Sequence, residues 1–75
     1  MKFIAHAVKI HDNDGTVQPG IYIHNEDFSY QHWVYLDGTT VTSYKGKGYC
    51  PVNEYTSELK DLDNFEKIEF LQPYL

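Results

Sequence analysis

The chain contains no arginine, a single cysteine and no long apolar run, and each absence argues against a class of function. Arginine is the commonest reader of guanine and phosphate, so its absence argues against duplex nucleic acid as a partner. Cys50 alone cannot form an internal disulfide, and no Cys and His pairing has the spacing of a structural zinc site. Without the about 18 apolar residues of a membrane span, or a secretory signal, we expect a cytoplasmic protein with no membrane partner.

Short length and net charge constrain the chain further. Its 75 residues carry six lysines and eleven carboxylates, for a net charge of -5. We expect one domain, residues 1–75, that buries only about 60 to 65% of the surface exposed by its unfolded chain. Because no disulfide can add stability and seven tyrosines need cover, we expect self-association into a homo-oligomer.

Alternation of apolar and polar residues predicts strands along most of the chain. The predicted strands are 3–10, 20–24, 28–36, 39–44 and 65–71. Asp14-Gly15 predicts a turn, and Asp37-Gly38 is the clearest hairpin signal because both positions accept positive φ. Pro19-Gly20 is expected to interrupt the chain before the second strand.

The pattern changes after Pro51, a residue that argues against a central strand at that position. Asn53 can cap a helix in which Tyr55, Leu59 and Leu62 recur at helical spacing. The resulting expectation is a small α+β fold. It would comprise an antiparallel β-sheet or partly open barrel of about five strands, with one short helix before the last strand.

One basic, glycine-spaced segment is the candidate ligand site. It comprises Tyr44, Lys45, Gly46, Lys47, Gly48 and Tyr49, with Trp33 as an additional stacking residue. Glycines allow backbone N–H groups to approach an anion, lysines neutralise its charge, and tyrosines stack on bases. From Gly38 to Asn53 there is no carboxylate to cancel the lysines. The segment lacks the pattern and following helix of a P-loop, and it also fits a solvated turn at the end of a hairpin.

Metal, cofactor and catalytic sites have no comparable signature. The four histidines, His6, His11, His24 and His32, fall on different predicted elements and show none of the local zinc spacings. Cys50 has no surrounding residues typical of a nucleophile. We therefore expect no metal ligand, no cofactor and no catalytic residue, and interpret the chain as a non-catalytic binding protein.

A second candidate surface is acidic. Six carboxylates gather near the C-terminus: Glu54, Glu58, Asp61, Asp63, Glu66 and Glu69. Such a face could occupy the basic groove of a host protein and inhibit it, or it could simply keep the chain soluble. Lys60 and Lys67 interrupt the acidic run and favour the second interpretation.

In its overall character the chain resembles the small accessory proteins of tailed phages, many of which counteract host defence. The resemblance rests on short length, acidity, abundant Tyr, Asp and Asn, and the absence of arginine. It implies that the protein either sequesters a nucleotide signal or binds and blocks a host protein. We expect the first function, with an anionic ligand such as a cyclic nucleotide, and retain the protein inhibitor as the alternative.

Overall fold

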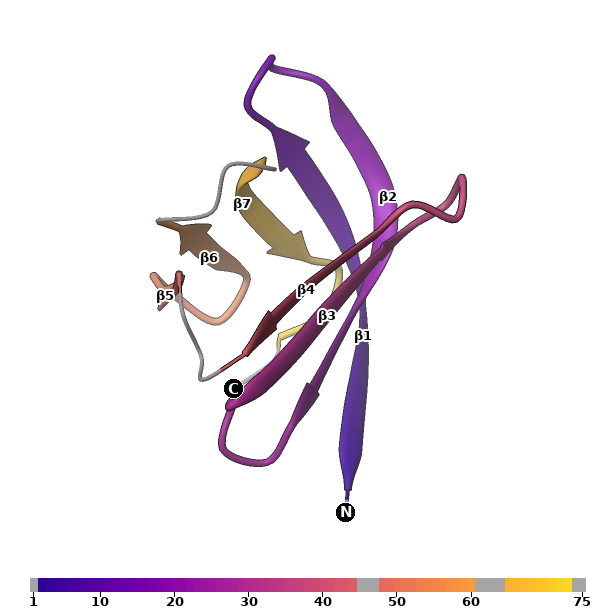
Figure 1. The fold of residues 1–75 in the computed structure, drawn as a ribbon. Coiled ribbons are helices and arrows are strands. Elements are labelled where there is room, and N and C mark those ends of the chain that lie inside the picture. Colours follow the sequence, from indigo (N-terminus) through magenta and orange to yellow (C-terminus); the bar gives the residue numbers. More distant parts are fainter. Residues whose placement is uncertain (1, 45–47, 61–64, 74–75) are drawn as a thin grey trace.

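The computed structural model describes residues 2–44, 48–60 and 65–73, and within these ranges the chain forms seven antiparallel strands in one sheet (Figure 1). The strands are β1 (Phe3–Asp12), β2 (Val17–Asn25), β3 (Tyr30–Tyr35), β4 (Thr40–Tyr44), β5 (Tyr49–Pro51), β6 (Thr56–Leu59) and β7 (Phe65–Phe70). They are ordered β4-β3-β2-β1-β7-β6-β5, and the sheet curls into a half-barrel. The two free edges are β4 and β5, which follow one another in the chain.

Both predicted Asp-Gly turns are confirmed. Gly15 and Gly38 have φ of 89° and 92°, values that a residue without a Cβ adopts at little cost. At each turn the aspartate accepts the N–H two residues on, Thr16 from Asp14 and Thr39 from Asp37, both at 2.9 Å. These hydrogen bonds hold the pKa of each carboxyl below its usual value.

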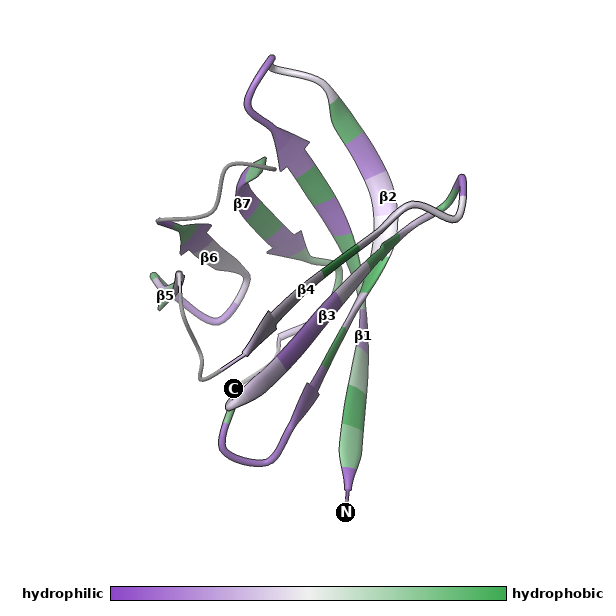
Figure 2. Ribbon diagram, viewed as in Figure 1, coloured by the Kyte–Doolittle hydropathy of each residue, from purple (hydrophilic) through white to green (hydrophobic). Residues whose placement is uncertain are grey.

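The core lies inside the half-barrel, because every second side chain along a strand points to this face of the sheet. It consists of Val8, Ile10, Tyr22, Trp33, Tyr35, Leu59, Phe65, Ile68 and Phe70. Figure 2 shows the corresponding alternation of hydrophobic and hydrophilic bands along β1 and β7. Alternation in the first strand places Ile4, His6, Val8 and Ile10 on one face, and of these Val8 and Ile10 are buried, whereas Ile4 is 37% exposed.

Pro19 and Gly20 lie within β2, so the expectation that they interrupt the chain is wrong. The carbonyl of Pro19 accepts the N–H of Leu36 at 3.3 Å, which places the proline nitrogen on the β3 side, where pairing begins only at Gly20. The missing N–H therefore leaves no ladder hydrogen bond unmade. A Cβ on Gly20 would lie 2.6 Å from both Ile10 Cδ1 and the carbonyl oxygen of Val34, so only glycine fits.

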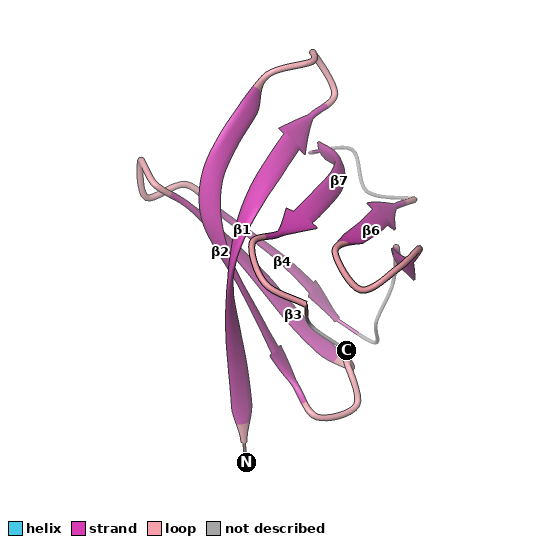
Figure 3. Cartoon of the chain, turned by 180° about the vertical axis from the view of Figure 1, so that it is seen from behind, coloured by secondary structure: helices cyan, strands magenta, loops and turns pink. Residues whose placement is uncertain are grey.

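The predicted helix, and with it the α+β class, is wrong: the described residues form an all-β fold (Figure 3). Asn53 caps a turn, in which its side-chain oxygen accepts the N–H of Tyr55 at 2.8 Å. The chain then enters β6, where Ser57 and Leu59 are buried and Glu58 is exposed. The four-residue spacing from Tyr55 to Leu59 suits a strand as well as a helix, and Leu59 lies opposite Tyr49 of β5 in the sheet.

Two strands, β5 and β6, raise the expected number from five to seven among the described residues. Pro51 lies in β5 at the edge of the sheet, which agrees with the prediction that it is excluded from a central strand. Leu62, the last residue of the predicted helix, lies outside the described residues.

The two ends of the half-barrel differ in chemistry. At one end, Asp12 accepts hydrogen bonds from the Tyr35 hydroxyl and the Gln18 amide, both at 2.7 Å. Burial, and then the hydrogen bond to Asp12, raise the pKa of the Tyr35 hydroxyl, so it stays a donor at any physiological pH. The other end carries an aromatic and histidine cluster.

Candidate functional site: an aromatic rim beside the basic segment

The candidate ligand residues separate in the structure. Tyr44 ends β4 on the outer face of the sheet, where it is 67% exposed and contacts Tyr30 edge to face at 5.7 Å. Tyr49 begins β5 and packs against the core, with its ring 5.5 Å from that of Tyr22. The two tyrosines therefore do not flank one ligand.

The other predicted ligand residues are only partly described. Lys45, Gly46 and Lys47 lie outside the described residues. Gly48 has φ of 85° and accepts the N–H of Lys60 at 2.8 Å, so it turns the chain into β5. Trp33 is fully buried, and its ring has no exposed surface on which a base could stack.

Tyr49 belongs to a group of rings that gathers at the open end of the half-barrel. We call this group the rim cluster, and it consists of His6, Tyr22, His24, Phe28 and Tyr49. The Phe28 ring stacks on His24 with centroids 4.1 Å apart and planes 8° apart, and lies 5.3 Å from the Tyr49 ring. Tyr22 and His24 are buried, whereas the other three members are partly exposed.

Phe28 has a backbone conformation that bulky residues avoid. Its φ is 61°, the only positive value among non-glycine residues in the described ranges. The left-handed region costs an L-residue roughly 1–2 kcal/mol, and such outliers concentrate at functional sites. In this strained backbone conformation, the Phe28 ring packs against His24 at the rim.

The turn between β2 and β3 imposes this conformation. Asn25 accepts the N–H of Phe28 on its carbonyl at 3.3 Å and the N–H of Tyr30 on its side chain at 3.1 Å. From the core side, the fully buried Gln31 donates to the Phe28 carbonyl at 3.2 Å. The side-chain oxygen of Gln31, Oε1, in turn accepts from the Tyr22 hydroxyl at 2.8 Å. A buried polar network therefore fixes the strained residue.

His6 and His24 meet within the rim cluster through their Nε2 atoms, which are 2.9 Å apart. Nδ1 of His24 lies 2.7 Å from the carbonyl of Asn25, which can only accept, so this nitrogen carries the proton. Nε2 of neutral His24 is then an acceptor, and His6 donates to it. Burial, and then the electrostatic effect of His24, lower the pKa of His6 below its usual value, which favours the neutral form of His6 near pH 7.

The geometry of this pair indicates a hydrogen bond and not a metal chelate. The two ring planes are 5° apart, and the ring centroids are 5.1 Å apart. This centroid separation equals the distance between the two Nε2 atoms plus about two ring radii, so the rings meet edge to edge through these nitrogens. Two imidazoles on one zinc would instead converge from different directions, with nitrogens roughly 3.3 Å apart at the usual bond length. No group of three metal-ligating side chains occurs among the described residues.

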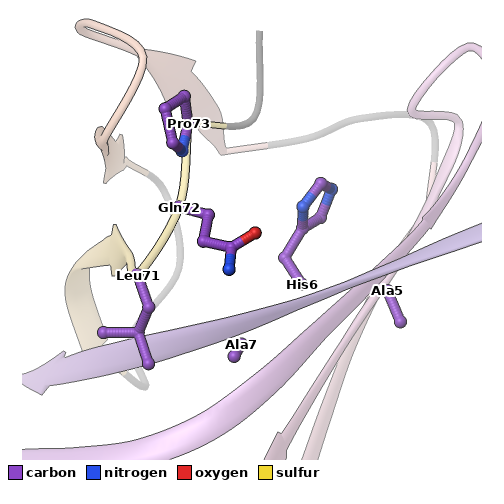
Figure 4. Close-up of a pocket in the computed structure, with 6 residues that line it drawn as sticks. All are labelled: Ala5, His6, Ala7, Leu71, Gln72 and Pro73. Atoms are coloured by element: carbon purple, nitrogen blue, oxygen red, sulfur yellow. The ribbon is translucent and has the colours of Figure 1, made fainter.

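A hollow of about 320 Å³ opens beside His6 (Figure 4). The last ladder pair between β1 and β7 is Val8 with Phe70, so among the described residues the first half of β1 has no strand partner on that side, and residues 71–73 lie beside it instead. The residues that line the hollow are Ala5, His6, Ala7, Leu71, Gln72 and Pro73. The imidazole and the Gln72 amide therefore supply polar groups next to the rim cluster.

The remaining two histidines have structural partners. His11 pairs with Glu69, and His32 lies 2.8 Å from the Thr42 hydroxyl. Cys50 is a partly buried free thiol in β5.

The acidic face is balanced by lysines where the structure describes it. Glu58 of β6 lies opposite Lys67 of β7, and Glu69 lies opposite Lys9 of β1. Cross-strand pairs of opposite charge attract each other, so this surface presents mixed charge instead of a continuous negative field. Asp61 and Asp63 lie outside the described residues, and Glu54 and Glu66 are exposed.

Comparison with known proteins identifies no relative: no family model, curated protein or solved structure matches the chain. The resemblance to phage accessory proteins accordingly stays a prediction. In the described ranges, no helix has the length and apolarity needed to cross a membrane.

Sequence reasoning identified Tyr49 but missed His6, His24 and Phe28 as parts of one site. Only the turn around Phe28 carries a local signal, since Asn25 and Asp27 are residues typical of tight turns. The other rings come together from β1, β2 and β5, which no local pattern could indicate.

Proposed function

We propose that the protein is a non-catalytic, cytoplasmic binding protein that sequesters a small anionic ligand with a flat ring, of the nucleotide type. The ligand's ring would contact the exposed parts of Phe28 and Tyr49 in the rim cluster. Lys45 and Lys47, which precede Gly48 in the sequence, would neutralise its phosphate.

The backbone of Phe28 is the observation that carries this proposal. A strained residue persists only where the surrounding structure holds it, and Asn25 and Gln31 do so here. If the ring only filled space, a residue without this strain would serve as well. A partly exposed aromatic ring held rigidly is, in contrast, a suitable stacking surface for a base.

Two further features support an anionic ligand. Gly48, with φ of 85°, turns the chain directly before Tyr49, and residues with positive φ expose successive backbone N–H groups. From Gly38 to Asn53 the sequence carries two lysines and no carboxylate, although the chain as a whole has a net charge of -5. A small anion can bind there because fields decay over about 8 Å at physiological salt.

Thermal denaturation across a panel of mononucleotides, cyclic mononucleotides and cyclic dinucleotides tests the proposal. A ligand at 100 times its Kd stabilises the folded state by about 2.7 kcal/mol. In a domain of this size that stabilisation raises Tm by about 10 to 20 °C. A panel in which no member shifts Tm or binds in isothermal titration calorimetry contradicts the proposal.

Two matched double variants separate a site from general charge. Lys45→Ala with Lys47→Ala should abolish the shift, whereas Lys60→Ala with Lys67→Ala removes the same charge from β6 and β7 and should preserve it. Equal losses in both variants would show that the ligand responds only to net charge. Tyr44→Ala should bind like the wild type, because Tyr44 lies on the outer face.

A further inference from the structure

The outer face of the sheet carries apolar side chains where solvent-facing strands are usually polar. Strand pairing aligns Ala7 of β1, Ile21 of β2 and Val34 of β3 in one row. The next row places Ala5 beside Ile23. Together with their exposed neighbours these residues form what we call the outer apolar face: Phe3, Ala5, Ala7, Ile21, Ile23, Val34, Leu36 and Leu71.

This face contains both a protrusion and a depression. Leu36 is 82% exposed after the end of β3, and Leu71 is 55% exposed after the end of β7. Between them lies a hollow of about 410 Å³, which Ile21 and Val34 also line. Ala7 also lines this hollow, and its small side chain leaves space between the larger side chains.

The outer apolar face contains no charged residue, although the chain carries a net charge of -5. The nearest charged pair, Lys9 and Glu69, occupies a row beyond Ala7. In a twofold dimer each patch meets its own copy, so a charged patch repels itself and an uncharged one does not. Two copies can therefore approach each other through this face without repulsion between like charges.

We propose that a second copy of this chain covers the outer apolar face in a twofold symmetric dimer, in which Leu36 of each copy lies in the hollow of the other. Burial of the apolar rows stabilises the dimer. This inference is independent of the proposed ligand, because the rim cluster lies inside the half-barrel and the outer apolar face lies outside it.

Molecular dimensions set the expected affinity. The Cα atoms extend over 33 × 24 × 23 Å, so the largest face measures about 800 Å² in Cα projection, as 33 × 24 Å. A standard-size interface takes about 800 Å² from each partner. The dimer must therefore use most of this face, and we expect a Kd in the micromolar range.

Sedimentation velocity between about 5 and about 500 µM, which brackets that range, tests the dimer. The wild type should shift from monomer to dimer as concentration rises. Ile21→Glu and Leu36→Glu should each raise Kd at least about 30-fold, because each buries an unpaired carboxylate between the apolar faces of the two copies. Val52→Glu is the matched control, since Val52 is an exposed apolar residue outside this face, and it should associate like the wild type.

Three results would overturn the dimer: a wild type that stays monomeric over the whole range, association that survives in both test variants, or equal loss in Val52→Glu. Circular dichroism verifies folding of each variant. If Ile21→Glu does not fold, Leu36→Glu carries the test, because its side chain is almost fully exposed in the monomer. A monomeric wild type that instead binds another protein or a lipid vesicle counts against the dimer.

Discussion

Substitution of Phe28 tests whether the rim cluster is held in a strained state. Phe28→Asn removes the ring but introduces a residue that tolerates the left-handed region. Phe28→Leu also removes the ring, yet leaves a bulky residue at φ of 61°. Comparison of the two variants separates the lost contacts from the released strain.

The magnitudes follow from the contacts of the ring. Its two aromatic pairs, with His24 and Tyr49, are worth about 0.5–1.5 kcal/mol each, and partial burial of the ring adds roughly 1 kcal/mol. Relief of the left-handed strain returns about 1–2 kcal/mol in Phe28→Asn. These contributions combine to a loss centred on about 1.5 kcal/mol for Phe28→Asn, and on about 2 kcal/mol for Phe28→Leu, which keeps the strain and part of the burial but loses the ring pairs.

Urea denaturation of both variants measures this order. Phe70→Ala provides the reference for a ring that belongs to the core, with an expected loss of about 3–5 kcal/mol. If Phe28→Leu is more stable than Phe28→Asn, or if Phe28→Asn loses as much as Phe70→Ala, the strain argument is refuted. Both Phe28 variants should also lose the nucleotide-dependent rise in Tm that the proposed function predicts.

Three further predictions concern the interior. Gly20→Ala places a Cβ 2.6 Å from the backbone oxygen of Val34, which cannot move aside. The resulting overpacking should cost about 2–3 kcal/mol of stability and lower Tm by about 10 to 20 °C. A Tm shift under about 4 °C would contradict the close approach. Tyr22→Phe removes the hydroxyl that donates to the buried side-chain oxygen of Gln31, and should lower the free energy of unfolding by about 1–3 kcal/mol in urea denaturation. A change near zero would contradict this prediction. Because the pKa of His6 is lowered in the folded state, the unfolded chain binds a proton first, and stability should fall as pH drops below about 6.5. In His6→Asn, the urea midpoint should depend less on pH than in the wild type. An unchanged pH dependence would show that another group causes it.

Local sequence is sufficient to predict those features that depend on local backbone geometry. Both Asp-Gly turns follow from positive φ at glycine and from a short carboxylate that accepts the N–H two residues on. The inward face of β1, with Val8 and Ile10, follows from period-two alternation. Pro51 belongs at an edge because it has no N–H to donate, and β5 is the edge.

Local sequence was ambiguous from Tyr55 to Leu59. A spacing of four residues places two side chains on one face of either a helix or a strand. Pairing with β5 and β7 resolves the ambiguity, because it satisfies the backbone of β6 across the sheet.

Local patterns in the sequence predict both Asp-Gly turns, most of the strands and the basic, carboxylate-free segment that ends at Tyr49. The side of the sheet on which each aromatic ring lies depends on the tertiary structure. The tertiary structure buries Trp33, places Tyr44 on the outer face, and assembles His6, His24 and Phe28 with Tyr49 at the rim. The physical reason is that curvature of the sheet, which depends on all of its strand pairs together, determines which alternate residues meet inside the half-barrel.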